Sequence, residues 1–441
     1  MIHCQSAPLR HNRFMTREST ILFQSKDVLV RAFLSDRRDR VVVSFDSFTD
    51  NPSLARAGFG ESFLTQRDID CILILTRSNL WYQEPEIPEA IRAIAAVTAG
   101  YHRVFTYGSS MGGYACIRHA HALGATAIAF APQYSVDPER VPEETRWPQA
   151  RRIAFQPADR HPVPPPEGAF IFYDPCDRLD RLHARRIAGD IASTLIPIAH
   201  GGHVVIAFLS EAGLLVPGVL ALLDGEFDPA TFIAEARARR KTVAKYYEVL
   251  SFRLRDTHPG WSIALARHAV SLSPEAGHIS QLANLLREQG RHQEAEPWAR
   301  RAVALDPENL NYRYCLAAVL MGRGERHESL ALALFLVAAV PDRQDYHRLL
   351  AGIHRLRGAF PQAFRSRLAA FRLTPRHSSA RRRAARILVM DALRALPLLG
   401  GAIGGLGQWL DRHPSLAAPS LFQRARVRGR NRSRKENRPA R

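Results

Sequence analysis

Residues 103–113 read RVFTYGSSMGG, and this stretch decides the fold predicted for the first half of the chain. Residues 103–107 are rich in β-branched and aromatic side chains, which is typical of a short buried strand. Residues 111–123 follow a helical pattern. The pentapeptide GSSMG at 108–112 therefore joins a strand to a helix, where a central serine sits on a strained turn with its Oγ exposed. Ser110 is then either a nucleophile or only the cap of the following helix.

Short apolar runs alternate with helical patterns along residues 20–225. Two β-rich runs separated by Ser25-Lys26 predict a hairpin. Further strands are expected at 41–45, 70–76, 103–107, 126–131, 169–173 and 194–198, with helices at 86–99, 111–123 and 183–191. This order predicts an α/β domain with a mostly parallel, doubly wound sheet. Residues 1–19 are polar, and we expect a flexible N-terminus there.

Residues 134–168 interrupt the alternation. Eight prolines and mixed charges occur between Gln133 and Gly168. A long irregular segment inside a compact domain is usually a lid or a binding loop, and otherwise a plain surface excursion. We therefore expect a lid or insertion within the α/β domain.

Helical patterns fill residues 230–380, with an internal repeat of 34 residues. The recurring residues are prolines at 307, 341 and 375, glycines at 290, 324 and 358, and alanines at 283, 317 and 351. The alanine allows two helices to approach closely, the glycine forms the turn between them, and the proline starts the next pair. The spacing therefore predicts a solenoid of helix-turn-helix units that share a continuous core.

These recurring residues resemble tetratricopeptide repeats. Further small-residue positions of that family are occupied by Ala295, Ala302, Ala363 and Ala370. The second unit departs from the pattern, because Ser329 and Leu336 stand at these positions. Residues 243–275 resemble a degenerate preceding unit that lacks the turn glycine. The resemblance implies a protein partner for the repeat region.

Length and composition exclude a disordered protein. With 441 residues, of which 46% are hydrophobic, the chain can form two or three domains with real cores. The five cysteines, at 4, 71, 116, 176 and 315, are far apart and lack metal-ligand spacing, so we expect reduced thiols, a cytoplasmic location, and neither metal nor cofactor. Neither an export signal nor a stretch of membrane-spanning length is visible in the sequence.

The net charge of +19 comes mostly from the end of the chain. From Arg376 onward there are sixteen Lys or Arg and three acids, a balance of +13. Residues 422–441 therefore predict a basic disordered tail that binds nucleic acid at most nonspecifically. Within residues 381–421 we expect a helix that caps the repeats, and the alternative is contact of residues 387–441 with a membrane surface.

A nucleophilic serine needs a base, and the base needs an acid that orients it. Two later strand ends offer these groups. After the strand at 169–173 the chain reads DPCDRLD (174–180), and after the strand at 194–198 it reads HGGH (200–203). The three features follow the order serine, acid, histidine. On this basis the first 220 or so residues resemble the α/β-hydrolase family, in which each group follows a strand.

The resemblance implies a role for each of these residues. Asp177 matches the family's acid best, with Asp174 as the second choice, whereas Asp180 reads as a helix cap. Gly202-His203 before an apolar helix matches the family's histidine, so His203 is the expected general base. His200 is then expected beside the site or facing the lid.

The resemblance also implies an oxyanion hole made of two backbone N–H groups. One belongs to Met111, directly after the serine, and the other to Asp46 or Ser47 in the loop after residues 41–45. That loop lacks the His-Gly pair of many family members, which leaves the second donor open.

Four residues that follow other strand ends, Trp81, Tyr82, Gln133 and Tyr134, either line the substrate pocket or only pack against the surface or lid.

These observations predict a serine esterase or related acyl hydrolase that uses a Ser-His-Asp triad and acts on a small-molecule or glycan ester. The helical repeats would recruit a partner or position a substrate. Two alternatives remain open from the sequence. One is an acyltransferase with the same triad, and the other is a catalytically silent hydrolase fold that serves with its repeats as an interaction scaffold.

Overall fold

The computed structural model describes residues 18–164, 166–374 and 379–395. The chain divides into two compact units, Met1–Val249 and Leu250–Arg441. Residues 1–17 of the expected flexible N-terminus, residues 396–421 of the expected capping region and the basic tail at 422–441 lie outside the described residues.

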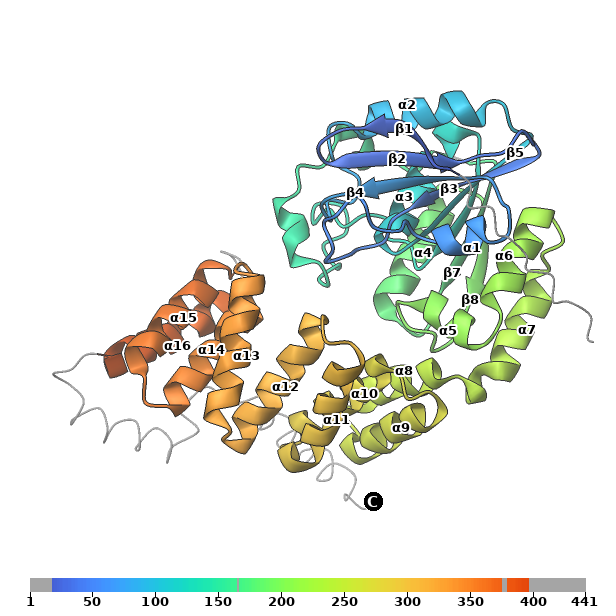
Figure 1. The fold of residues 1–441 in the computed structure, drawn as a ribbon. Coiled ribbons are helices and arrows are strands. Elements are labelled where there is room, and N and C mark those ends of the chain that lie inside the picture. Colours follow the sequence, from blue (N-terminus) through green and yellow to red (C-terminus); the bar gives the residue numbers. More distant parts are fainter. Residues whose placement is uncertain (1–17, 165, 375–378, 396–441) are drawn as a thin grey trace, which may run out of the picture. The chain divides into compact units, whose positions relative to one another are not determined.

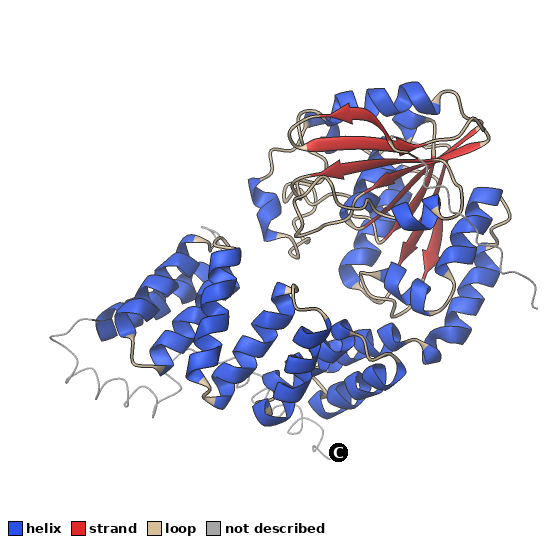
Figure 2. Cartoon of the chain, in the orientation of Figure 1, coloured by secondary structure: helices blue, strands red, loops and turns tan. Residues whose placement is uncertain are grey.

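The first unit is built on an 8-stranded sheet, counted over its described residues (Figures 1 and 2). Its strands are β1 (Thr20–Gln24), β2 (Val28–Phe33), β3 (Arg40–Phe45), β4 (Cys71–Thr76), β5 (Arg103–Ser109), β6 (Thr126–Phe130), β7 (Gly168–Tyr173) and β8 (Thr194–Pro197). Their order in the sheet is β1-β2-β4-β3-β5-β6-β7-β8. β2 is antiparallel to β1 and β4, and the other pairings are parallel. The predicted hairpin and the mostly parallel sheet are therefore confirmed.

Helices cover both faces of this sheet. They are α1 (Glu61–Thr65), α2 (Ile87–Thr98), α3 (Met111–His119), α4 (Arg178–Asp190), α5 (Val205–Glu211), α6 (Leu215–Asp224) and α7 (Pro229–Arg239), with 3-10 turns η1 (His121–Leu123), η2 (Pro148–Arg152), η3 (Pro157–Arg160) and η4 (Arg240–Thr242). One hydrophobic core joins the sheet to α2, α3 and α4, and the other joins its opposite face to α1, α5, α6 and α7. α7 packs on the sheet, so the first unit extends past residue 225, where we expected it to end.

The side chains of the central strands explain why both faces are covered. In β4 every residue is buried, and successive side chains alternate between the two cores. A strand with apolar residues on both faces is stable only when helices exclude water from each side. The carboxyl ends of the parallel strands then meet at one edge of the sheet, which is where a ligand binds in folds of this type.

The second unit consists of helix pairs. Its helices are α9 (Pro259–Leu272), α10 (Ala276–Glu288), α11 (His292–Leu305), α12 (Leu310–Arg323), α13 (Arg326–Ala339), α14 (Gln344–Leu356), α15 (Phe360–Arg372) and α16 (Ser379–Ala395), and α8 (Ala244–Leu254) crosses the boundary between the units. From α9 to α16 each helix packs against the next along the chain. The predicted helical, tetratricopeptide-like solenoid is confirmed at this level.

The repeat residues have the roles that their spacing predicts. Gly290, Gly324 and Gly358 end their helices with φ of +75°, +86° and +73°, a conformation that favours glycine. Ser329, which replaces a small apolar residue in the second unit, is buried and donates from Oγ to the carbonyl of Ala317 at 2.8 Å. The hydroxyl is therefore satisfied inside the helix pair, and the departure from the pattern is tolerated.

α16 supplies the first described part of the expected capping region. It packs against α15, and Arg367 Nε lies 3.3 Å from the buried carboxylate of Asp391. This ion pair explains how the carboxylate of Asp391 is accommodated although it is buried.

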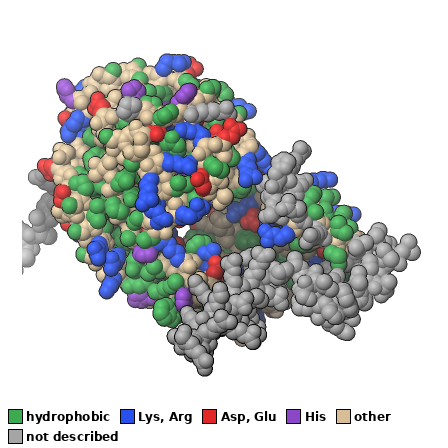
Figure 3. Space-filling view, turned by 180° about the vertical axis from the view of Figure 1, so that it is seen from behind, with side chains coloured by type: hydrophobic (Ala, Val, Ile, Leu, Met, Phe, Trp, Pro, Cys, Tyr) green, Lys and Arg blue, Asp and Glu red, His purple; other side chains and the backbone are tan. Residues whose placement is uncertain are grey.

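The surface charge and the helix lengths bear on the nucleic-acid and membrane alternatives. On the face shown in Figure 3, Lys and Arg side chains are scattered among hydrophobic and acidic ones. No single helix of the described residues is long and apolar enough to cross a membrane. Only α5 and α6 together pass that test, and they bend by 102°.

Candidate active site

Ser110 lies on a strained turn between β5 and α3. Its backbone has φ 54° and ψ −114°, which is an unfavourable conformation for a residue with a side chain. The turn also brings backbone segments into close contact. A Cβ on Gly108 would lie 2.3 Å from the carbonyl oxygen of Gly112, and one on Gly112 would lie 2.3 Å from that of Phe45. Both glycines of the pentapeptide are therefore required by packing, and the strained turn predicted for Ser110 is present.

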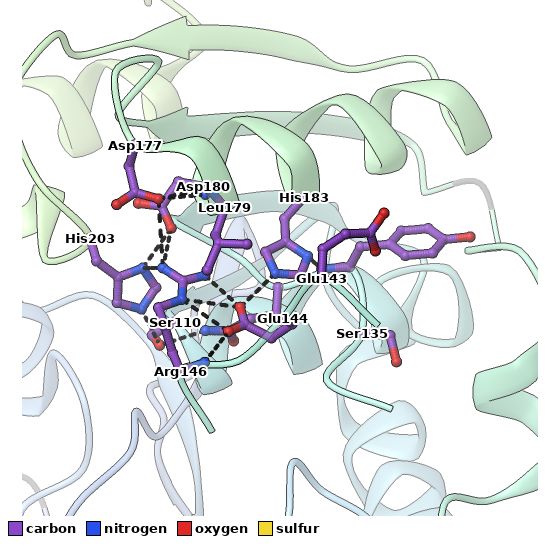
Figure 4. Close-up of polar contacts among 12 residues, drawn as sticks. Ser110, Ser135, Glu143, Glu144, Arg146, Asp177, Leu179, Asp180, His183 and His203 are labelled. Atoms are coloured by element: carbon purple, nitrogen blue, oxygen red, sulfur yellow. Dashed lines mark hydrogen bonds and ion pairs between the residues drawn. The ribbon is translucent and has the colours of Figure 1, made fainter. Parts of the chain in front are cut away.

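The structure brings Ser110 together with His203. Ser110 Oγ lies 2.8 Å from His203 Nε2, although the two residues are far apart in the sequence. The other ring nitrogen, His203 Nδ1, lies 2.8 Å from Asp180 Oδ1 (Figure 4). Burial raises the pKa of Asp180, but the hydrogen bond from His203 and the charge of Arg146 outweigh it, so the net shift is downward. Asp180 is therefore ionised and accepts a hydrogen bond from the N–H at Nδ1, which leaves Nε2 free to accept one from the serine hydroxyl.

The expected acids, Asp177 and Asp174, do not contact His203. Asp177 is instead the N-cap of α4, and its carboxylate accepts hydrogen bonds from the backbone N–H groups of Leu179 and Asp180. α4 consequently begins at Arg178, several residues earlier than we expected. Asp180 then falls in the first turn of the helix and faces His203. The predicted roles of Asp177 and Asp180 are thus exchanged, because the cap lies one helical turn upstream.

Asp174 has a structural role in the same loop region. Its Oδ1 accepts from the N–H of Cys176 at 2.9 Å and of His200 at 3.0 Å, and its Oδ2 accepts from the N–H of Gly202 at 2.8 Å. The buried carboxylate thereby ties the turn after β7 to the loop that carries His203. The Nε2 of His200 lies 3.8 Å from Cys176 Sγ.

The insertion at 134–168 contributes a charged cluster that the sequence did not predict. Arg146 Nη1 lies 2.7 Å from Asp180 Oδ1 and 3.1 Å from His203 Nδ1, so two donors converge on one carboxylate oxygen. Arg146 Nη2 lies 2.7 Å from Glu144 Oε2. Glu144 is also bonded by His183, whose Nε2 lies 2.9 Å from the same oxygen (Figure 4).

Charge and burial set the ionisation of this cluster. Burial raises the pKa of Glu144, but hydrogen bonds from His183 and Arg146 dominate and lower it to about 2. Burial lowers the pKa of His183, whose Nδ1 accepts a hydrogen bond from the backbone N–H of Tyr134. Carboxylates beside Arg146 raise the pKa of its guanidinium despite burial. Glu144 and Arg146 are therefore both charged, and His183 is neutral.

Gln133 lies beside the nucleophile. Its Nε2 donates to Ser110 Oγ at 2.9 Å, and its Oε1 accepts from Trp81 Nε1 at 3.3 Å. Trp81 packs edge-on against Trp147, and the ring of Trp147 lies 6.1 Å from that of His203. Phe48 stacks on Trp147 at 5.2 Å and thereby extends this aromatic group. An aromatic wall of Phe48, Trp81 and Trp147 therefore flanks the contact between Ser110 and His203.

Tyr82 and Tyr134, the other expected pocket residues, are engaged elsewhere. The hydroxyl of Tyr82 is buried and donates to the carbonyl of Asp46 at 2.9 Å. The Tyr134 hydroxyl accepts from Arg140 at 2.6 Å, and the guanidinium of Arg140 lies over the tyrosine ring. Both contacts favour a packing role.

The expected oxyanion donors differ in availability. Met111 is the first residue of α3, so its N–H has no partner within the helix. The N–H of Asp46 is directed to the carbonyl of Ile74 at 3.4 Å, and the Asp46 carboxylate is held by Arg56. Within the described part of the chain the Ser47 N–H has no hydrogen-bond acceptor, while its Oγ donates to the carbonyl of Ser109 at 2.9 Å. Met111 and Ser47 are therefore the better pair.

Sequence reasoning missed Asp180, Arg146, Glu144 and His183. One signal was available for two of them, since Asp180 and His183 are three residues apart and share a helix face once α4 begins at Arg178. The insertion has no periodicity that could have predicted Glu144 or Arg146. Among the described residues, no group of His, Cys, Asp and Glu is suited to hold a metal ion.

Comparison with known proteins found solved structures that resemble part of the chain. No protein-family model matches the sequence, and no curated protein does. MamA from Desulfovibrio magneticus RS-1 is 21% identical, with a TM-score of 0.27, over 30% of this chain and 76% of its own. A tetratricopeptide protein of Thermus thermophilus, TTC0263, is 20% identical, with a TM-score of 0.32, over 41% of this chain and 99% of its own. PilF of Pseudomonas aeruginosa is 16% identical, with a TM-score of 0.33, over 51% of this chain and 98% of its own. Because these scores are low, the repeat assignment rests on the chain's own spacing and helix pairs.

Proposed function

We propose that the first unit is a serine hydrolase of the α/β-hydrolase type that acts on ester bonds. The observation that carries this proposal is the continuous contact from Ser110 Oγ through the imidazole of His203 to Asp180, with 2.8 Å at each step. Chance proximity of three polar residues would not also place the serine on a strained turn that two obligatory glycines permit. The three groups follow β5, β7 and β8, so they belong to one edge of the sheet.

The geometry is suited to acyl transfer through the serine. Ser110 Oγ attacks an ester carbonyl while His203 Nε2 accepts its proton, and Asp180 stabilises the imidazolium that forms. The backbone N–H groups of Met111 and Ser47 are the proposed donors to the oxyanion. His203 then returns the proton to the leaving alcohol, and later activates water to hydrolyse the acyl-serine. Each hydrogen-bond donor to the oxyanion typically contributes about 10²- to 10³-fold to the rate.

Residues near the serine suggest which part of a substrate they would touch. The amide of Gln133 holds the Ser110 hydroxyl in place, and the aromatic wall offers apolar contact area beside it. We therefore expect an ester whose acyl or alcohol part has an apolar or planar surface. The helical repeats are proposed to recruit a protein partner, because solenoids present extended surfaces for binding.

Labelling with a fluorophosphonate probe tests the proposal directly. The intact chain should react at Ser110, and both Ser110→Ala and His203→Ala should abolish the reaction. His200→Ala is the matched control, since His200 lies in the same loop but does not contact Ser110. Absence of Ser110-dependent labelling in a folded protein would refute every enzymatic interpretation and leave an interaction scaffold. Product analysis with and without an added alcohol acceptor then separates hydrolase from acyltransferase.

A further inference from the structure

A buried ion pair from the insertion lies against the proposed catalytic base. Arg146 reaches Asp180 and approaches His203 Nδ1, while Glu144 engages the same guanidinium from its other side. The Glu144 and Asp180 side chains are each only 1% exposed, and Arg146 is 22% exposed. Charges that are so little screened by water act strongly on one another.

The arrangement creates an electrostatic conflict when His203 takes up a proton. Arg146 Nη1 is 3.1 Å from His203 Nδ1, so an imidazolium would form beside an existing cation. Like charges at this distance disfavour protonation of the ring. Proton transfer from Ser110 requires that same protonated state, so an isolated arginine here would oppose catalysis.

Glu144 removes the conflict. When His203 is protonated, the two cations His203 and Arg146 face the two carboxylates Asp180 and Glu144, and the four charges sum to zero. Glu144 is held in this position by His183, which donates from Nε2 at 2.9 Å and remains neutral. The transition state for serine attack therefore develops inside a balanced group of charges.

Asp177 is a further charged residue that faces the cluster. Asp177 Oδ1 lies 4.0 Å from Arg146 Nη1, and its side chain is 33% exposed. Its carboxylate accepts from two backbone N–H groups at the N-terminus of α4, where the helix dipole stabilises a negative charge. Asp177 thus contributes a partly screened charge that is the same in every variant considered below.

We propose that Glu144 and Arg146 are a pair of positioning residues whose opposite charges balance beside His203, so that loss of either one alone shifts the pH at which His203 acts as a base. This inference rests on the proposed function. Arg146 also fixes the carboxylate of Asp180, because its guanidinium shares Oδ1 with the imidazole. The insertion therefore provides electrostatic control of the triad from a segment that contributes none of its three members.

The test measures the rate of Ser110 labelling by the fluorophosphonate probe as a function of pH in the full chain. Loss of a positive charge in Arg146→Gln should favour the protonated imidazole and raise the midpoint of the profile by about one pH unit or more. Loss of a negative charge in Glu144→Gln should lower the midpoint by a similar amount. The double variant should return close to the wild-type midpoint, since the pair is removed as a neutral unit.

Two control variants separate charge from structure. Glu143→Gln removes a neighbouring carboxylate that pairs with Arg186 instead of Arg146, and it should leave the midpoint unchanged. Arg146→Lys retains the charge and should also keep the midpoint near the wild-type value, even if the rate falls.

Opposite shifts in the two single variants support the inference, whereas unchanged midpoints or shifts of the same sign overturn it. If Arg146→Gln does not fold, the direction in which the midpoint shifts in Glu144→Gln decides. An upward shift, or none, refutes the proposed role of the pair. If wild-type Ser110 does not react at all, the proposed function has failed instead.

Discussion

Replacement of Asp180 by asparagine tests the assignment of the acid most sharply. Asp180 Oδ1 accepts from His203 Nδ1 at 2.8 Å and from Arg146 at 2.7 Å. An asparagine has nearly the same shape but no charge, so the imidazolium loses its counter-ion beside an arginine that remains. The corresponding change in serine proteases costs about 10⁴-fold in rate, and we expect a loss of about 10³- to 10⁴-fold in Ser110 labelling.

The two neighbouring aspartates are matched controls with different expected outcomes. Asp177→Asn should change neither labelling nor stability appreciably, because asparagine caps a helix about as well as aspartate. Asp174→Asn should be destabilising instead. The NH₂ group of the asparagine would face a backbone N–H that now donates a hydrogen bond to the Asp174 carboxylate. A buried donor left without an acceptor lowers the free energy of unfolding by about 1–3 kcal/mol.

The assay combines labelling kinetics with thermal unfolding of the first unit. Asp180→Asn should lose reactivity while its melting temperature stays close to that of the wild type, and Asp174→Asn should lower the melting temperature by several degrees. A protein that labels normally as Asp180→Asn but fails as Asp177→Asn would refute the reasoning and restore the acid inferred from the sequence.

Three further predictions follow from the described contacts. Gly112→Ala should abolish labelling and destabilise the first unit by about 1–3 kcal/mol, because its Cβ would lie 2.3 Å from a carbonyl oxygen, whereas Gly189→Ala, where nothing lies within 4 Å, should fold normally. Gln133→Ala should slow Ser110 labelling by about 3- to 10-fold through loss of one hydrogen bond, and an unchanged rate would contradict this role. Burial raises the pKa of Glu84 from 4.5 to about 7. The folded protein therefore favours the protonated carboxyl group, and the free energy of unfolding falls as the pH rises from about 4.5 to 7. Denaturant titration should find Glu84→Gln more stable than the wild type by up to about 3 kcal/mol at pH 8, but not at pH 4.

The sequence predicted those parts of the fold that local patterns specify. Continuous apolar runs identified the strands, because a strand buried on both faces must be apolar along its whole length. The repeat of 34 residues identified the helix pairs, because each pair needs a small residue at its crossing and a glycine at its turn. The order of the strands in the sheet and the residue at which the second unit starts could not be predicted from the sequence. Both depend on contacts between residues that are distant in sequence, namely the pairing of strands and the packing of α7.

In the candidate site, too, only the residues that stand in local sequence motifs could be predicted. Ser110 and His203 stand in short motifs whose backbone geometry needs glycine, and these two were brought together as expected. The acid was misassigned by one helical turn, because Asp177 and Asp180 are both good N-caps and only the observed helix start distinguishes them. A difference of three residues in a helix changes which side chain faces the histidine.

Glu144 and Arg146 both lie in the insertion, so any displacement of the insertion would move their two charges together. Both residues belong to one short segment, so displacing that segment would remove one negative and one positive charge together. The charge around Asp180 and His203 would then stay nearly constant, although substitution of either residue alone would change it. A neutral pair can thus approach and leave the triad without changing the charge on which the base depends, which is a physical reason for the insertion to carry both residues and not the arginine alone.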